Sequence, residues 1–142
     1  MARCTVAGRA SVAPTAARGP SVYATAAVRP HIKEVGVFNT TTTGCAVGVA
    51  RATTTGTQGA ALTRVCENDP LISPVATAFN THTADATVGA ALRQGNLGAA
   101  AGSGIIWTFE DVEITEGTGN GFVIVCPTGT GQIIDFYIVW LE

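Results

Sequence analysis

The chain has 142 residues, a length typical of one domain, and its composition limits the partners it can have. Only 13% of the residues are charged and the formal net charge is −2, so a small monomer of this kind tends to associate with copies of itself or with a larger assembly. Seven of the eight basic residues lie in residues 1–64, but no two are adjacent, which argues against the clustered footprint of a nucleic-acid-binding protein. No apolar run approaches the ~20 residues that span a bilayer, and no secretory signal is evident, so we expect synthesis in a cytoplasm and no membrane partner.

Residues 1–20 differ in character from the rest of the chain. They combine small residues, two prolines and three arginines without a sustained period, which indicates an extended N-terminal arm or a short edge strand. We therefore divide the chain into an arm, residues 1–20, and a single β-sandwich domain, residues 21–142.

The elements expected after the arm are short strands. Thr, Val, Ile and Gly suit pleated sheets and tight turns better than helices. A helix remains an alternative for residues 83–94, where Thr83 or Asp85 offers an N-cap but Gly89 opposes it. Eight or nine strands without an established helix predict an all-β fold, an antiparallel β-sandwich of jelly-roll type. The predicted strands are residues 21–28, 31–39, 45–51, 60–66, 76–83, 87–93, 105–116, 122–126 and 133–141.

Residues 117–142 give the strongest structural signal, a β-hairpin whose second strand is apolar on both faces. A strand of this kind needs a cover on its second face, from another sheet or from another subunit. Alternation places Ile134, Phe136, Ile138 and Trp140 on one face, opposite Ile133, Asp135, Tyr137, Val139 and Leu141. The residues that we expect at a subunit interface are Tyr137, Val139, Trp140 and Leu141.

Neither the cysteines nor the acidic residues form a metal motif. Cys4, Cys45, Cys66 and Cys126 show no paired spacing, so we expect no zinc and reduced thiols throughout. The acidic cluster of residues 110–116 (Glu110, Asp111, Glu113 and Glu116) alternates between strand faces, whereas calcium needs a looped array of oxygens. We interpret the cluster as a solvated strand edge and expect no cofactor.

Catalytic residues are not evident either. His31 and His82 are the two histidines, and neither has a nucleophile motif near it in the sequence, although a serine, histidine and acid can meet in space. The glycine-rich runs lack the lysine of a phosphate loop and indicate β-turns. Four aromatic residues offer either a sugar site or core and interface packing, of which we favour the second: Tyr23, Trp107, Tyr137 and Trp140. We expect a protein that is not an enzyme.

Several strand-and-turn signatures carry a resemblance to a known group of proteins. They are residues 29–39 (RPHIKEVGVFN), 49–59 (VARATTTGTQG), 104–107 (GIIW), 117–122 (GTGNGF) and 137–142 (YIVWLE). Together they resemble small structural proteins encoded by tailed bacteriophages. The resemblance spans most of the chain after residue 20, but it contains no catalytic motif.

The resemblance implies a component of the virion, and specifically a decoration or cement protein on the outside of the capsid. It implies the major capsid protein as partner, and a repeated shell site favours a symmetric oligomer, commonly a homotrimer. The arm then supplies the residues that we expect to contact an acidic capsid surface, Arg3, Arg9 and Arg18. The alternatives are a tail, neck or fibre component, a carbohydrate-binding module for host attachment, or an enzyme on the same scaffold.

Overall fold

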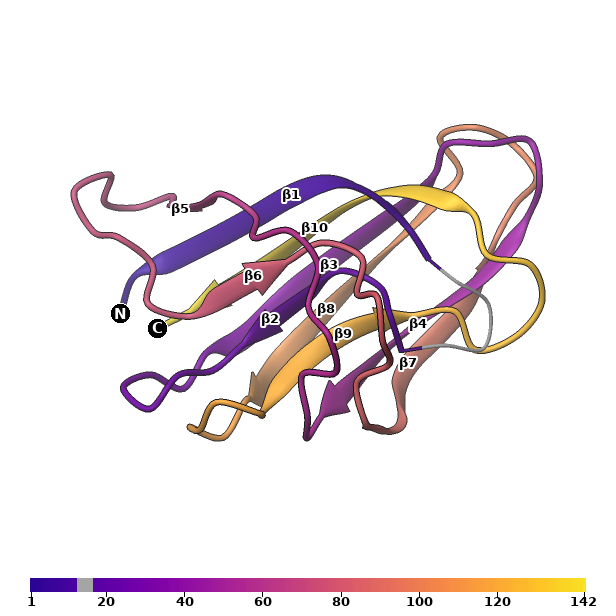
Figure 1. The fold of residues 1–142 in the computed structure, drawn as a ribbon. Coiled ribbons are helices and arrows are strands. Elements are labelled where there is room, and N and C mark those ends of the chain that lie inside the picture. Colours follow the sequence, from indigo (N-terminus) through magenta and orange to yellow (C-terminus); the bar gives the residue numbers. More distant parts are fainter. Residues whose placement is uncertain (13–16) are drawn as a thin grey trace.

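The computed structural model describes residues 1–12 and 17–142, which form two antiparallel five-stranded sheets packed face to face (Figure 1). No helix occurs among the described residues, so the all-β prediction is confirmed and the alternative helix at residues 83–94 is wrong. The strands are β1 (Arg3–Ser11), β2 (Ser21–Tyr23), β3 (His31–Asn39), β4 (Cys45–Ala52), β5 (Arg64–Cys66), β6 (Thr77–Phe79), β7 (Val88–Leu97), β8 (Gly104–Glu113), β9 (Gly121–Val125) and β10 (Ile133–Leu141).

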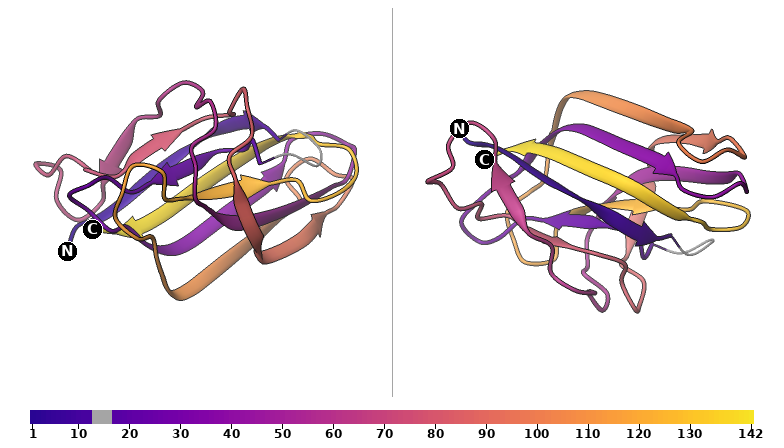
Figure 2. Two further views of the ribbon diagram at one scale, coloured as in Figure 1. Left: turned by 60° about the horizontal axis from the view of Figure 1, so that its bottom comes forward. Right: turned by 90° about the horizontal axis from the view of Figure 1, so that it is seen from above.

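The strand order is that of a jelly roll with one short strand added to each sheet. The first sheet has the order β5-β1-β10-β3-β8 and the second has the order β6-β2-β9-β4-β7. From β1 to β4 and again from β7 to β10 the chain alternates between the two sheets, and every pairing is antiparallel. The strands of both layers run along the long dimension of the molecule (Figure 2).

The main core lies between the two sheets and follows the alternation of the strands. In β10 the side chains of Ile134, Phe136, Ile138 and Trp140 are each at most 3% exposed, which confirms that they share the inward face. In β9, Phe122 and Ile124 face them from the opposite sheet. Phe109 of β8 contacts Phe122 edge to face with ring centroids 5.9 Å apart, so aromatic packing also joins the layers.

A β-bulge in β3 breaks the strict alternation of that strand. On the neighbouring β10, Val139 pairs with Glu34 and the next residue, Trp140, pairs with Ile32, so one extra residue of β3 lies between the two pairs. Because of this insertion Ile32 and Val35 are both fully buried in the core, although strict alternation would place them on opposite faces.

The prediction of an N-terminal arm is wrong for most of its length. Residues 3–11 form β1, which pairs with β10 along nine residues and with β5 on its other side, so this strand lies inside a sheet. Its inward side chains, among them Cys4, Val6 and Ala10, belong to the main core. Single apolar residues between Gly and Arg were enough to make a strand, because β10 pairs with it along its whole length and β5 pairs with it at Cys4–Val6. Residues 13–16 of the predicted arm lie outside the described residues.

The second sheet carries a smaller cluster on its outer face. Val123 and Val125 of β9 point away from the main core, and Tyr23 covers them together with small residues of three other segments. The cover includes Ala52 at the end of β4 and Ala86 in the loop before β7, and the loops after β4 and before β7 are joined by a bridge between Thr57 and Ala84. The second face of β9 is therefore buried by the chain itself.

Candidate interaction face

The pairing of β1 with β10 places most of the predicted contact residues on one surface. Arg3 lies opposite Leu141, Thr5 lies opposite Val139, and Arg9 lies opposite Asp135. Side chains at opposite positions of an antiparallel pair lie on the same face of the sheet. We call the surface of the first sheet that points away from the core the outer face. It contains Arg3 and Arg9 from β1, Tyr137, Val139 and Leu141 from β10, Phe38 from β3 and Ile106 from β8.

Two predicted contact residues lie elsewhere. Trp140 is 0% exposed in the main core, where its indole N–H donates to the carboxylate of Glu142 at 2.9 Å. The prediction of Trp140 as an interface residue is therefore wrong, because alternation turns it away from Tyr137 and Leu141. Arg18 lies shortly before β2, outside the β1–β10 pair, and forms an ion pair with Asp85 at 2.5 Å.

The arginines of the outer face are paired within the chain. Arg9 makes two hydrogen bonds to Asp135, at 2.7 and 3.0 Å, and this guanidinium lowers the pKa of the Asp135 carboxyl. Arg3 binds Glu67 at 2.7 Å. All four side chains keep between 38% and 66% of their surface exposed, so the pairs are screened by water and contribute little to stability. Their effect is to neutralise the outer face and leave its apolar part dominant.

Tyr137 and Phe38 form an aromatic pair in the middle of the outer face. Tyr137 lies flat over Gly36, since a Cβ on that glycine would come within 2.2 Å of the tyrosine ring. Phe38 stacks against Tyr137 with ring centroids 6.3 Å apart, and Ile106 on the adjacent strand is 54% exposed. The Tyr137 hydroxyl donates to Glu34 at 2.6 Å, and burial together with this carboxylate raises the pKa of Tyr137 to about 12. The aromatic pair is therefore held in place by contacts within the chain, and the tyrosine hydroxyl is uncharged at neutral pH.

Three of the four acidic residues in the cluster at the edge of this sheet form ion pairs. Asp111 accepts from His31 at 2.8 Å and from Lys33 at 3.3 Å, and these two partners lower the pKa of Asp111. Glu113 and Glu116 both pair with Arg29 at 3.1 Å. Within residues 1–12 and 17–142, no group of three or more His, Cys, Asp or Glu side chains is placed to hold a metal ion.

His82 has a serine partner that the sequence did not reveal. Its Nδ1 donates to the carbonyl of Thr55 at 2.8 Å, so Nε2 accepts from the hydroxyl of Ser21 at 2.7 Å. This is the tautomer of a serine–histidine catalytic pair, but Ser21 is 0% and His82 is 2% exposed, so a substrate cannot reach them. Burial lowers the pKa of His82. The pair fixes the loops that cover the second sheet.

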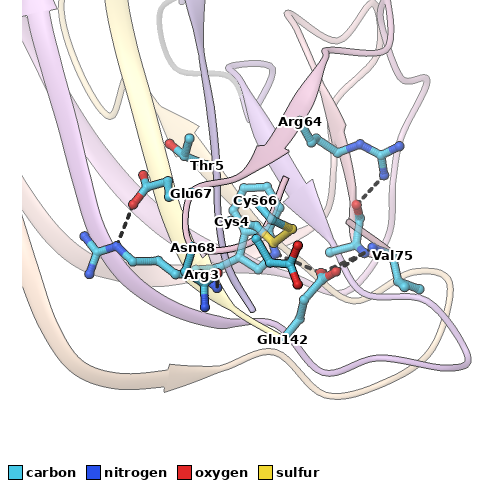
Figure 3. Close-up of a disulfide and its surroundings, with 12 residues drawn as sticks. Arg3, Cys4, Thr5, Arg64, Cys66, Glu67, Asn68, Val75 and Glu142 are labelled. Carbon is cyan, nitrogen blue, oxygen red and sulfur yellow. Dashed lines mark hydrogen bonds and ion pairs between the residues drawn. A yellow bond between two sulfur atoms is a disulfide. The ribbon is translucent and has the colours of Figure 1, made fainter. Parts of the chain in front are cut away.

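One end of the sandwich holds both chain termini (Figure 1) and a disulfide, which Figure 3 shows in close-up. Cys4 of β1 and Cys66 of β5 are directly opposite in the sheet and are bonded to each other, so the prediction of reduced thiols is wrong for these two. A separation of 62 residues gave no sign of their contact in space. Cys45 is a buried thiol whose pKa is raised by burial and by the nearby Cys126.

The hollows of the surface are shallow. One of about 300 Å³ lies over the second sheet, where Gln94 and Asn96 of β7 and Thr128 of the β9–β10 loop line it with polar groups. The aromatic residues considered for a sugar site do not converge there, since Tyr23 lies in the smaller cluster and Trp107 packs against the main core. No described segment is a helix of the length and apolarity needed to cross a membrane.

Comparisons with known proteins add no family. No family model, no curated protein and no solved structure matches the chain. The resemblance to small phage structural proteins therefore stays a prediction, and any function has to be argued from the surfaces described above.

Proposed function

We propose that this protein is a structural component of a phage virion that binds the outside of the capsid as an oligomeric decoration or cement protein and stabilises the shell. In this proposal the partners are the major capsid protein and further copies of the chain, in a homotrimer. The resemblance noted in the sequence supports this function, and so do two features of the structure.

The observation that carries the proposal is the outer face of the first sheet. Its charges are neutralised by pairs such as Arg9 with Asp135, and its centre holds Tyr137, Phe38 and the exposed Ile106. Exposed apolar surface rimmed by polar groups is typical of a protein–protein interface. We assign this face to the contact between subunits. Arg3 and Arg9 then act at the rim of that contact, which replaces the proposal that a free arm carries them to the capsid.

The disulfide between Cys4 and Cys66 supports a role outside a reducing cytosol. Disulfides persist in oxidising surroundings, which a virion meets when its host lyses. The cross-link also fixes the short edge strand β5 covalently to β1. Both properties suit a protein that stabilises a shell outside the cell.

The test is co-sedimentation of the purified protein with heads of the encoding phage that were assembled without it, together with its native mass. Saturable binding in a fixed ratio to the major capsid protein, with a trimeric mass, is the expected result. Absence of binding to these heads, together with detection of the protein on tails, would refute the capsid assignment.

A second candidate is a carbohydrate-binding module for host attachment, and the polar hollow of the second sheet favours it. The amide side chains of Gln94 and Asn96 line this hollow beside Thr128, and amides of this kind hydrogen-bond sugar hydroxyls. Binding of the protein to host glycans, lost on substitution of Asn96 by Ala, would support this function over capsid decoration.

A further inference from the structure

We propose that the loop between β5 and β6, residues 67–76, is the element that contacts the shell, and that it inserts its apolar tip into an apolar pocket of a shell subunit. This inference rests on the proposed function and names the contact residues for it. It also moves the shell contact away from the arginines predicted from the sequence.

The tip of this loop is the most exposed apolar surface of the chain. Leu71 is 93% exposed, Ile72 is 45% exposed and Val75 is 48% exposed. Val65 at the base of the loop is 53% exposed, and Met1, whose carbonyl accepts from Asn68, is 77% exposed. Five large apolar side chains therefore gather at one end of the sandwich, the end that carries both termini in Figure 1.

The base of the loop is fastened at several points, as Figure 3 shows. The disulfide of Cys66 ties its first end to β1, and the side chain of Asn68 accepts from the backbone N–H of Arg3 at 2.7 Å. At its second end the carboxylate of Glu142 accepts from the backbone N–H of Val75 at 2.5 Å and from that of Ala76 at 3.0 Å.

Arg64 adds a further tie by donating to the carbonyl of Ala76. At the tip, the side chain of Asp69 accepts from the backbone N–H of Leu71 at 2.9 Å, and Pro70 and Pro74 restrict the backbone on either side. An exposed leucine on a loop restrained in this way loses little conformational freedom when it binds, which favours its use as an anchor.

The exposed area argues against pairing of this surface with its own copy. A fully exposed aliphatic side chain offers roughly 60–120 Å² of apolar area, so the five residues expose roughly 200–400 Å² in total. A two-fold pairing of such a patch would bury about 400–800 Å², below the ~1,200 Å² at which specific interfaces begin. A protruding tip buries a larger area when it enters a concave surface of a partner.

The charges of the loop indicate which residues surround the pocket of the partner. Glu67 is paired with Arg3, but among the described residues Asp69 has no cationic partner. The tip therefore presents apolar side chains beside one carboxylate, which fits an apolar pocket with a basic residue at its edge. An anionic lipid surface fits poorly, because the carboxylate would be repelled.

The experiment compares three proteins in the same head-binding assay: the wild type, the double variant Leu71→Ser/Ile72→Ser, and the control variant Ala90→Ser/Ala91→Ser. Ala90 and Ala91 are control positions because both are exposed apolar residues on β7, in the second sheet, outside both the outer face and the loop. We expect the double variant to lose at least about 30-fold in affinity, the threshold of an interface hot spot, and the control to bind like the wild type. Urea unfolding and native mass verify that all three are folded and equally oligomeric.

Each outcome decides the inference. Equal binding by the wild type and the double variant would overturn the loop contact while the proposed function stands. Loss of the oligomer in the double variant would show that the loop docks on a second copy, which also overturns it. A wild type that does not bind heads would refute the proposed function and the loop contact together.

Discussion

Reduction of the Cys4–Cys66 disulfide should produce the largest stability change available in this chain without a packing defect. The bond closes a loop with a sequence separation of 62 residues. In the chain-entropy treatment, a loop of this length removes about 14 cal/mol/K from the unfolded state, which corresponds to about 4 kcal/mol at 25 °C. For a domain of this size, a loss of this magnitude lowers the melting temperature by roughly 10 °C.

The assay is urea unfolding of the wild type with and without a phosphine reductant, beside the double variant Cys4→Ser/Cys66→Ser. With a slope of about 2 kcal/mol per molar urea, the midpoint of the wild type should fall by about 2 M on reduction. The midpoint of the variant should not respond to the reductant, which controls for effects on Cys45 and Cys126. A wild type whose midpoint moves by less than about 0.5 M would refute the reasoning, because the cross-link would then contribute almost nothing to the folded state.

Three further predictions concern single groups. The pKa of His82 is lowered by burial, so the unfolded chain binds more protons below pH 6.5. Stability is therefore full above pH 6.5 and falls as the pH drops below it, and the variant His82→Gln should flatten this part of a urea-midpoint profile. Gly36→Ala should destabilise the fold by about 1–3 kcal/mol by displacing the Tyr137 ring, and the same change in a Tyr137→Ala background should cost less. The pKa of both tyrosines, Tyr23 and Tyr137, is raised to about 12, so ultraviolet absorbance should show almost no tyrosinate in the folded protein at pH 10. Because the unfolded chain loses these protons at lower pH, the stability should fall as the pH rises from 10 to 12. Ionisation at pH 10 in the folded state would contradict the burial of both rings.

The sequence predicted the strands that depend on local pattern, but the hairpin predicted for residues 117–142 is wrong, because β9 and β10 lie in different sheets and do not pair. Alternation in residues 133–141 was strong enough to assign the inward face of β10 without error, because a one-residue slip would have exposed Ile134 and Trp140 together. The spacing of short strands likewise indicated the sandwich. The same alternation assigns Trp140 to the core and not to an interface, since it shares a face with Ile138.

The features that were missed depend on contacts between distant segments. β1 was interpreted as an arm because its apolar residues are small, and only β5 and β10 on either side make it a buried strand. The disulfide of Cys4 has its partner 62 residues away, and the serine partner of His82 is 61 residues away. Nothing in local spacing encodes such pairs. The bulge at β3 was missed for the same reason, since it is defined by its pairing with β10.

The outer face and the loop of residues 67–76 differ in direction, and this difference allows them to act together. The outer face runs along the strands from β1 to β8, whereas the loop lies at the end of those strands. When copies of a chain meet around a rotation axis that runs along their strands, every copy presents the same strand end at the same level. An oligomer built through the outer face would then present all its apolar tips, each led by Leu71, toward one side. If the protein has the proposed function, linked tips of this kind would bind a repeated shell surface with an avidity about 10²–10⁴ times that of a single tip, so that a tip with a small apolar area would suffice.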